Sequence, residues 1–208
     1  MLEASKKKRV AVLISGRGSN MEALIEASKH PDCPYQITLV FSNIAEAKGL
    51  ETAKKAGIET AILDHRGHGG RAAYDRKVLD ILKAANADIV VLAGYMRIIT
   101  PEFVAAWEGR MLNIHPALLP SFTGLDTHQR ALDAGVKLHG CTVHFVTAEL
   151  DAGPIIAQAS VPVLDEDTEE TLAHRVLKQE HRIYAEALKD LAAGNLILKD
   201  KRVFHRKG

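Results

Sequence analysis

Short apolar runs alternate with stretches of helical spacing along the first half of the chain. The runs are rich in Val, Ile and Leu and lie at 10–14, 37–41, 61–63 and 89–92. Each is followed by a helical pattern, and these patterns lie at 21–29, 45–56, 71–85 and 101–107. Alternation of this kind predicts βαβ units and therefore a parallel sheet with helices on both faces. The run 89–92 is apolar at every position, which is typical of a central strand.

The pattern changes after a fifth apolar run at 111–115. Two neighbouring apolar runs come next, at 141–146 and 155–161. A long helical stretch follows at 168–193 and is terminated by Gly194, and a last pair of short runs lies at 196–198 and 203–204. The closely spaced runs predict hairpins. The predicted fold class is α/β: an open, mostly parallel twisted sheet of Rossmann type with helices on both faces, whose C-terminal part adds antiparallel hairpin strands and a long closing helix.

Composition limits the classes of function. With 208 residues, of which 47% are hydrophobic, the chain is expected to form one domain over 1–208, with a flexible basic leader at 1–9. A net charge of +1 gives no broad surface for nucleic acid or for an anionic membrane. The apolar run after the leader is too short for a signal peptide or a membrane span, so a cytoplasmic protein is expected. Cys33 and Cys141 are expected to be reduced thiols.

A glycine-rich loop, 15–20, lies between the first predicted strand and its helix. Exposed N–H groups and the helix dipole favour an anion there, so Gly18, Ser19 and Asn20 are candidate phosphate ligands. The loop lacks the Gly-Lys-Ser/Thr of a P-loop, and Met21 occupies the third glycine position of a dinucleotide fingerprint. A monophosphate is therefore favoured over a dinucleotide. The alternative is an ordinary tight turn in which Ser19 or Asn20 caps the helix.

Acyl chemistry is indicated by Asn113 and His115, which lie two residues apart at the end of a predicted strand and so share a face. An amide that stabilises an oxyanion beside an imidazole that moves a proton suits such chemistry. Asp151, in the polar loop between the later strands, is placed to pair with His115 and to favour its charged form. A polar strand end and a turn-forming Asp are the structural alternatives. Because no nucleophile elbow is present, direct attack by an acceptor amine is favoured over an acyl-enzyme.

The remaining histidines indicate no metal site. His65 and His68 lie in a glycine-rich loop, which would make a poor metal cage, so a solvated loop is expected. His144 is expected to be packed or to support the site, and His181 to cover the edge of the core.

Five segments, in order, resemble one family: Ser-Gly-x-Gly-Ser-Asn at 15–20, Val-Phe-Ser-Asn at 40–43, Leu-Ala-Gly-Tyr-Met-Arg-Ile at 92–98, Asn-Ile-His-Pro at 113–116 and Leu-Asp-x-Gly-Pro at 150–154. They are similar to the folate-dependent phosphoribosylglycinamide formyltransferases, with a likeness that runs from about Val10 to Tyr184. The resemblance implies transfer of a formyl group from 10-formyltetrahydrofolate to the amine of glycinamide ribonucleotide in purine biosynthesis, by direct attack through a tetrahedral intermediate and without a metal.

The same resemblance implies roles for individual residues. Catalysis would be carried out by Asn113, His115 and Asp151. The ribonucleotide would be bound by residues of the glycine loop and two further positions, namely Gly18, Ser19, Asn20, Gly94 and Glu180. The reduced folate would be held by Arg71, Leu92, Met96, Arg97, Ile98, Thr147, Ala148, Glu149 and Leu150. Small molecules would be the only partners, with neither nucleic acid nor membrane, and the assembly would be a monomer or a homodimer.

Two departures and three rivals accompany this resemblance. Thr123 stands where a lysine is common, and Ala185 where proline is usual. Formyltetrahydrofolate hydrolase is a rival that would carry an extra N-terminal domain, and the formyltransferase of initiator methionyl-tRNA would carry an RNA-binding one, so both are disfavoured. A non-catalytic nucleotide-phosphate binding module, in which Asn113 and His115 are structural, is the alternative from another class.

Overall fold

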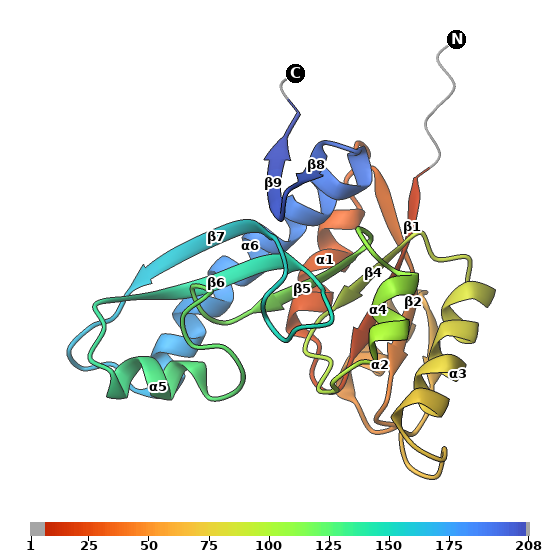
Figure 1. Ribbon diagram of the computed structural model, residues 1–208, viewed down its shortest axis with the longest axis horizontal. Helices are drawn as coiled ribbons and strands as arrows, with labels where there is room; N and C mark the ends of the chain where they lie inside the picture. Colours follow the sequence, from red (N-terminus) through yellow and green to blue (C-terminus); the bar gives the residue numbers. More distant parts are fainter. Residues whose placement is uncertain (1–6, 207–208) are drawn as a thin grey trace.

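The computed structural model describes residues 7–206, and its main feature is a seven-stranded sheet in the order β3-β2-β1-β4-β5-β6-β7 (Figure 1). The strands of this sheet are β1 (Lys8–Ile14), β2 (Tyr35–Ser42), β3 (Glu59–Ile62), β4 (Ile89–Leu92), β5 (Met111–His115), β6 (Leu138–Phe145) and β7 (Ile155–Pro162). The first five strands pair in parallel, and β6 is antiparallel to both of its neighbours. The predicted fold class is confirmed.

Helices cover both faces of the sheet (Figure 1). They are α1 (Ser19–Ser28), α2 (Lys48–Lys55), α3 (Arg71–Ala84), α4 (Pro101–Ala106), α5 (Thr127–Asp133) and α6 (Glu169–Ala193). One hydrophobic core joins the sheet to α1, α2, α5 and α6, and a second joins it to α3 and α4. A final hairpin of β8 (Leu196–Lys199) and β9 (Arg202–His205) follows α6, as predicted. Within residues 7–206 no helix is both long and apolar enough to cross a membrane.

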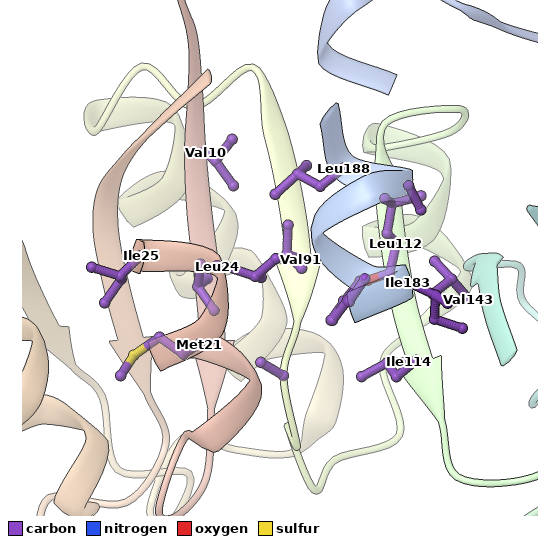
Figure 2. Packing of buried hydrophobic residues seen from close by; sticks show 14 of the residues in the cluster. Val10, Met21, Leu24, Ile25, Val91, Leu112, Ile114, Val143, Ile183 and Leu188 are labelled. Atoms are coloured by element: carbon purple, nitrogen blue, oxygen red, sulfur yellow. The ribbon is translucent and has the colours of Figure 1, made fainter. Parts of the chain in front are cut away.

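The two cores follow from the alternation of side chains along the strands. In β1, Val10, Val12 and Ile14 belong to the first core, whereas Ala11 and Leu13 belong to the second. Figure 2 shows the first core, in which residues of α1 and α6 lie over β1, β4, β5 and β6, including Leu24, Val91, Leu112, Ile183 and Leu188. Burial of one such side chain contributes about 1.5–3 kcal/mol, so this packing holds α1 and α6 against the sheet.

The strand order places a topological switch point between β1 and β4. The chain proceeds from β1 to β2 and β3 on one side of the sheet and then returns to β4 on the other. Loops that follow β1 and β4 therefore diverge at the carboxyl edge, which is where ligands bind in open α/β sheets. Strands β5 and β6 pair in antiparallel fashion, and Asn113 lies directly opposite His144. Directly opposite residues of paired strands lie on the same face of the sheet, so these two side chains are neighbours.

Three features differ from the sequence prediction. Helix α5 was not predicted, because only Thr127 and Ala131 of its seven residues are buried and its apolar pattern is too short to detect. Lys8 and Arg9, expected in a flexible leader, belong to β1, where the backbone N–H of Arg9 donates to Asp88 at 2.8 Å. Residues 1–6 of that leader lie outside the described residues. Helix α2 begins at Lys48, three residues later than predicted.

Candidate active site

The glycine loop is held open at the N-terminus of α1. Gly18 is the N-cap residue with φ 77°, a left-handed conformation that favours glycine, and α1 starts at Ser19 with no side-chain cap. The predicted alternative, in which Ser19 or Asn20 caps the helix, is therefore wrong. N–H groups of the first turn are left for a ligand, as an anion site at a helix N-terminus requires.

Helix α2 supports this loop, a feature that the sequence did not reveal. The N–H of Gly49 donates to the carbonyl oxygen of Gly16 at 3.1 Å. A Cβ atom at Gly49 would lie 2.6 Å from Cδ1 of Ile14 and 3.1 Å from the carbonyl oxygen of Arg17. Glycine therefore lets α2 approach the loop this closely without displacing Ile14 or the loop backbone.

Asn20 and Glu180, 160 residues apart in the sequence, meet beside the glycine loop. The Asn20 Nδ2 donates to Glu180 Oε2 at 2.7 Å, and Glu180 is 7% exposed. Burial raises the pKa of the Glu180 carboxyl, and the Asn20 hydrogen bond opposes that shift. The Oδ1 atom of Asn20 is buried without a partner within the described residues. A buried carboxylate with a free lone pair can accept hydrogen bonds from the hydroxyl groups of a bound sugar.

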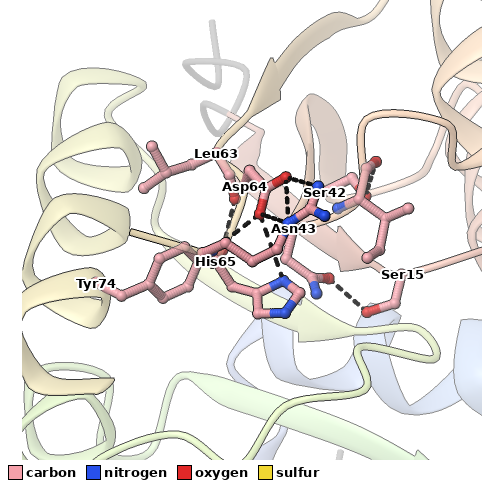
Figure 3. A network of polar contacts seen from close by, with 9 residues as sticks. Ser15, Ser42, Asn43, Leu63, Asp64, His65 and Tyr74 are labelled. Atoms are coloured by element: carbon pink, nitrogen blue, oxygen red, sulfur yellow. Dashed lines mark hydrogen bonds and ion pairs between the residues drawn. The ribbon is translucent and has the colours of Figure 1, made fainter. Parts of the chain in front are cut away.

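A polar network ties the loops after β1, β2 and β4 together. The Ser15 hydroxyl donates to Asn43 Oδ1 at 2.6 Å, as Figure 3 shows, and accepts from the N–H of Met96 at 2.8 Å. The N–H of Ser15 donates to the carbonyl oxygen of Gly94 at 3.1 Å. Gly94 thus lies next to the glycine loop at the switch point.

His115 and Asp151 form a buried pair, although Asp151 comes from the loop between β6 and β7. The His115 Nδ1 lies 3.5 Å from Asp151 Oδ2, and the two side chains are 6% and 7% exposed. The structure therefore brings together the imidazole and the carboxylate that sequence alone could only suggest. Gly153 permits this loop path, since a Cβ there would lie 1.8 Å from the carbonyl oxygen of Phe145.

The backbone that follows β5 holds the same pair from the other side. The ring nitrogen Nε2 of His115 lies 2.9 Å from the carbonyl oxygen of Phe122, so this nitrogen donates. The N–H of Gly124 donates to Asp151 Oδ2 at 2.9 Å. Acceptors therefore face both ring nitrogens of His115, the Phe122 carbonyl oxygen at hydrogen-bond distance and the Asp151 carboxylate at ion-pair distance.

Asn113 is oriented by His144, the residue opposite it on β6. Asn113 Nδ2 lies 3.3 Å from His144 Nε2, and His144 Nδ1 lies 2.9 Å from the carbonyl oxygen of Phe145. A neutral His144 ring protonated at Nδ1 satisfies both contacts, and burial lowers the pKa of His144, which favours this neutral form. One N–H of the Asn113 amide is thereby fixed, and the other stays available to a reacting oxygen. His144 thus has the supporting position expected of it.

Residues expected to hold the folate are spread over three segments. Met96, Ile98 and Leu150 are exposed by 69%, 59% and 61%, so they offer apolar surface for a flat ring. The guanidinium of Arg97 lies 4.5 Å from the centroid of the Tyr74 ring. The remaining positions are the first residue of α3, the end of β4 and the loop after β6, namely Arg71, Leu92, Thr147, Ala148 and Glu149. Leu92 is buried, and its carbonyl oxygen accepts from the Tyr184 hydroxyl at 2.8 Å.

Other candidate chemistry is sparse in residues 7–206. They contain no group of three or more His, Cys, Asp or Glu side chains that could hold a metal ion. Both cysteines, Cys33 and Cys141, are buried free thiols. His65 lies beside Asp64 in the network of Figure 3, and His68 contacts Lys77. His181 Nε2 is buried without a partner within these residues.

The fold and the site define an α/β enzyme of Rossmann type, with a glycine loop at the switch point and a buried histidine–aspartate pair one strand away from β4. Residues 8–188 match the family model described as formyl transferase. The chain therefore belongs to the formyl transferase family.

Particular members of the family are similar to most of the chain. Phosphoribosylglycinamide formyltransferase of Escherichia coli (strain K12) is 49% identical over 187 residues, which cover 90% of this chain and 88% of that protein. Glycinamide ribonucleotide transformylase 1 from Symbiobacterium toebii has a solved structure with a TM-score of 0.94 and 45% identity, covering 97% of this chain and 95% of that one.

Two further cases limit the comparison. The trifunctional purine biosynthetic protein adenosine-3 of Bos taurus is 51% identical over 189 residues, which cover 91% of this chain but 19% of that protein. The chain thus spans about a fifth of such relatives. A formyltetrahydrofolate deformylase from Pseudomonas syringae pv. tomato shares the fold at a TM-score of 0.90 with 28% identity, covering 98% of this chain and 67% of that one. The fold alone therefore does not separate transfer from hydrolysis.

Proposed function

We propose that this chain transfers the formyl group of 10-formyltetrahydrofolate to the amine of glycinamide ribonucleotide in purine biosynthesis. The observation that carries the proposal is the buried His115–Asp151 pair, with the Asn113 amide two residues from His115 on the same strand face. Membership of the formyl transferase family and the names of its most similar relatives support the choice of substrates.

In the proposed reaction the acceptor amine attacks the formyl carbon, and a tetrahedral intermediate forms. The free N–H of Asn113 donates to the oxyanion, and His115, whose ring nitrogens face Phe122 and Asp151, contributes the positive charge of its protonated ring. The carbon–nitrogen bond to the folate then breaks. The amine loses one proton and the folate nitrogen gains one, so the reaction needs no net proton, and Asp151 organises the path between the two nitrogen atoms.

The substrates would lie on the two sides of this centre. Gly18, Ser19 and Asn20 would bind the phosphate of the ribonucleotide, and Gly94 and Glu180 would line the rest of its site. The reduced folate would lie against the end of β4, the loops that follow β4 and β6, and the Arg71 side chain. The positions in the strand end and the two loops are Leu92, Met96, Arg97, Ile98, Thr147, Ala148, Glu149 and Leu150. The buried free thiols of Cys33 and Cys141 fit a reducing cytoplasm, and we expect a monomer or a homodimer.

The test is to incubate the protein with 10-formyltetrahydrofolate, with and without glycinamide ribonucleotide, and to follow loss of the formyl donor and formation of formylated product. Loss that depends on the amine supports transfer. Loss without the amine supports the hydrolase, and no loss at all supports a binding module. The His115→Ala variant serves as the control and should fold normally while turnover falls by about a hundredfold or more.

A further inference from the structure

A short backbone segment, residues 122–125, bridges the two members of the buried pair. Its Phe122 carbonyl oxygen accepts from His115 Nε2, and its Gly124 N–H donates to Asp151 Oδ2, both at 2.9 Å. These two backbone groups lie only two residues apart. Any displacement of this segment therefore moves the imidazole and the carboxylate together.

The segment has an unfavourable backbone conformation. Phe122 has φ 55°, Gly124 φ 80° and Asp126 φ 55°, so left-handed residues occur at every second position. For a bulky residue such as Phe122 this conformation costs on the order of 1–2 kcal/mol. The segment keeps its shape only if surrounding contacts determine it.

Hydrogen bonds to side chains of β6 and β7 anchor the backbone just before this segment. The N–H of Leu119 donates to the Thr142 hydroxyl at 3.0 Å, and the Leu119 carbonyl oxygen accepts from Gln158 at 2.9 Å. Both partners belong to neighbouring strands of the sheet. Within the described residues neither of these strands hydrogen-bonds to the backbone of the segment 122–125, which contacts β6 through the rings of Phe122 and His139, so its backbone needs another support.

Arg130 of α5 supplies that support. Its Nη1 donates to the carbonyl oxygens of Thr123, at 2.6 Å, and Leu125, at 3.2 Å. Its guanidinium lies 5.7 Å from the centroid of the Phe122 ring, which His139 contacts edge-on at 5.8 Å. Burial lowers the pKa of His139 to about 4, so this ring is neutral at neutral pH and does not repel the guanidinium.

We propose that Arg130 is a positioning residue for catalysis, which holds the segment 122–125 so that its backbone can orient His115 and Asp151. This inference rests on the proposed function. Arg130 is an exposed residue on the outer side of α5, and its effect on the reaction passes through the segment it holds. Its loss should therefore lower kcat and leave the KM of both substrates largely unchanged.

The experiment compares kcat, both KM values and thermal stability for the wild type, Arg130→Ala and Arg130→Lys. Lysine keeps a cation near the Phe122 ring and one donor group, but it loses the planar fork of the guanidinium. We expect kcat to fall about ten- to a hundredfold for Arg130→Ala, and by a smaller factor for Arg130→Lys. The matched control is Gln129→Ala, because Gln129 is the exposed neighbour on α5 and bonds to Asp133; its kcat should stay within twofold of the wild type.

A descending order of kcat from wild type through the lysine to the alanine variant, at nearly constant KM, supports the inference. Equal kcat values in all three proteins, or a loss expressed only in KM, overturn it. If Arg130→Ala fails to fold, the lysine variant decides by the same criterion against Gln129→Ala. Failure of the proposed function would look different, since the wild type itself would then show no amine-dependent transfer.

Discussion

Replacement of Asp151 by asparagine tests whether the His115–Asp151 pair acts through charge. An asparagine has nearly the same shape, and its Oδ1 can still accept from the Gly124 N–H that now contacts the carboxylate. The segment that bridges the pair should therefore stay in place. What is lost is the negative charge 3.5 Å from His115 Nδ1.

The size of the effect follows from this distance. Two unit charges at 3.5 Å interact by about 5 kcal/mol at an effective dielectric constant of about 20. That figure is an upper bound, because the amide dipole and local rearrangement compensate for part of the lost charge. About 3–4 kcal/mol of the stabilisation of an imidazolium would disappear, so we expect kcat to fall by a hundred- to a thousandfold.

The assay is steady-state transfer from 10-formyltetrahydrofolate to glycinamide ribonucleotide, with KM measured for each substrate. Asp165→Asn is the matched control, because it removes a carboxylate that is 88% exposed and contacts only the exposed Lys137 in the structure. A surface pair of this kind contributes little, so the control should keep the wild-type kcat. An Asp151→Asn enzyme within threefold of the wild type would refute the charge argument.

A double-variant cycle asks whether the two residues act as one unit. If Asp151 works through His115, the combination of Asp151→Asn with His115→Ala should be no slower than His115→Ala alone. Multiplication of the two separate losses would instead show that Asp151 contacts the substrate or a water independently of His115.

Three further predictions concern other parts of the site. Glu180→Gln should raise the melting temperature at neutral pH but increase the KM of the acceptor. Because the folded pKa of Glu180 is raised, this gain in melting temperature should vanish below about pH 4.5, grow between that pH and the raised pKa, and stay constant above it. Gly153→Ala should lower both kcat and the melting temperature, since the new Cβ displaces the Asp151 loop from the Phe145 carbonyl, and wild-type values of both would exclude this steric role. Asn20→Ala should chiefly raise the acceptor KM, and an unchanged KM would contradict the phosphate assignment.

Most of the fold could be predicted because hydrophobic periodicity records burial directly. The runs at 89–92 and 111–115 coincide with β4 and β5, and the long helix was placed within one residue of Glu169–Ala193. Helix α5 was not predicted because it packs through only two small buried side chains, Thr127 and Ala131, and a pattern of two positions has no detectable period.

The candidate site was predictable in its residue types but not in its connections. Asn113 and His115 share a face because of strand geometry, which a sequence shows. The pairing of Asp151 with His115 depends on a loop path that only tertiary structure fixes. The support given by Gly49 and Arg130 is even harder to predict from the sequence. Gly49 acts by the absence of a Cβ atom, and Arg130 acts through backbone carbonyls of a neighbouring segment. Neither contact leaves a periodic or motif-like signal.

The strand order also sets the length of the acceptor that the site can use. The glycine loop follows β1, whereas His115 ends β5, and only β4 lies between them. Neighbouring strands are about 4.8 Å apart, so under the proposed function a ligand with its phosphate on the loop must place its amine roughly 10 Å away to reach the proposed catalytic side chains. A phosphorylated pentose with a short amine-bearing arm spans such a distance, and inorganic phosphate or a free amino acid does not. Acceptors that lack either the phosphate or the arm should therefore lose turnover as well as affinity, because binding at one end no longer positions the amine at the other.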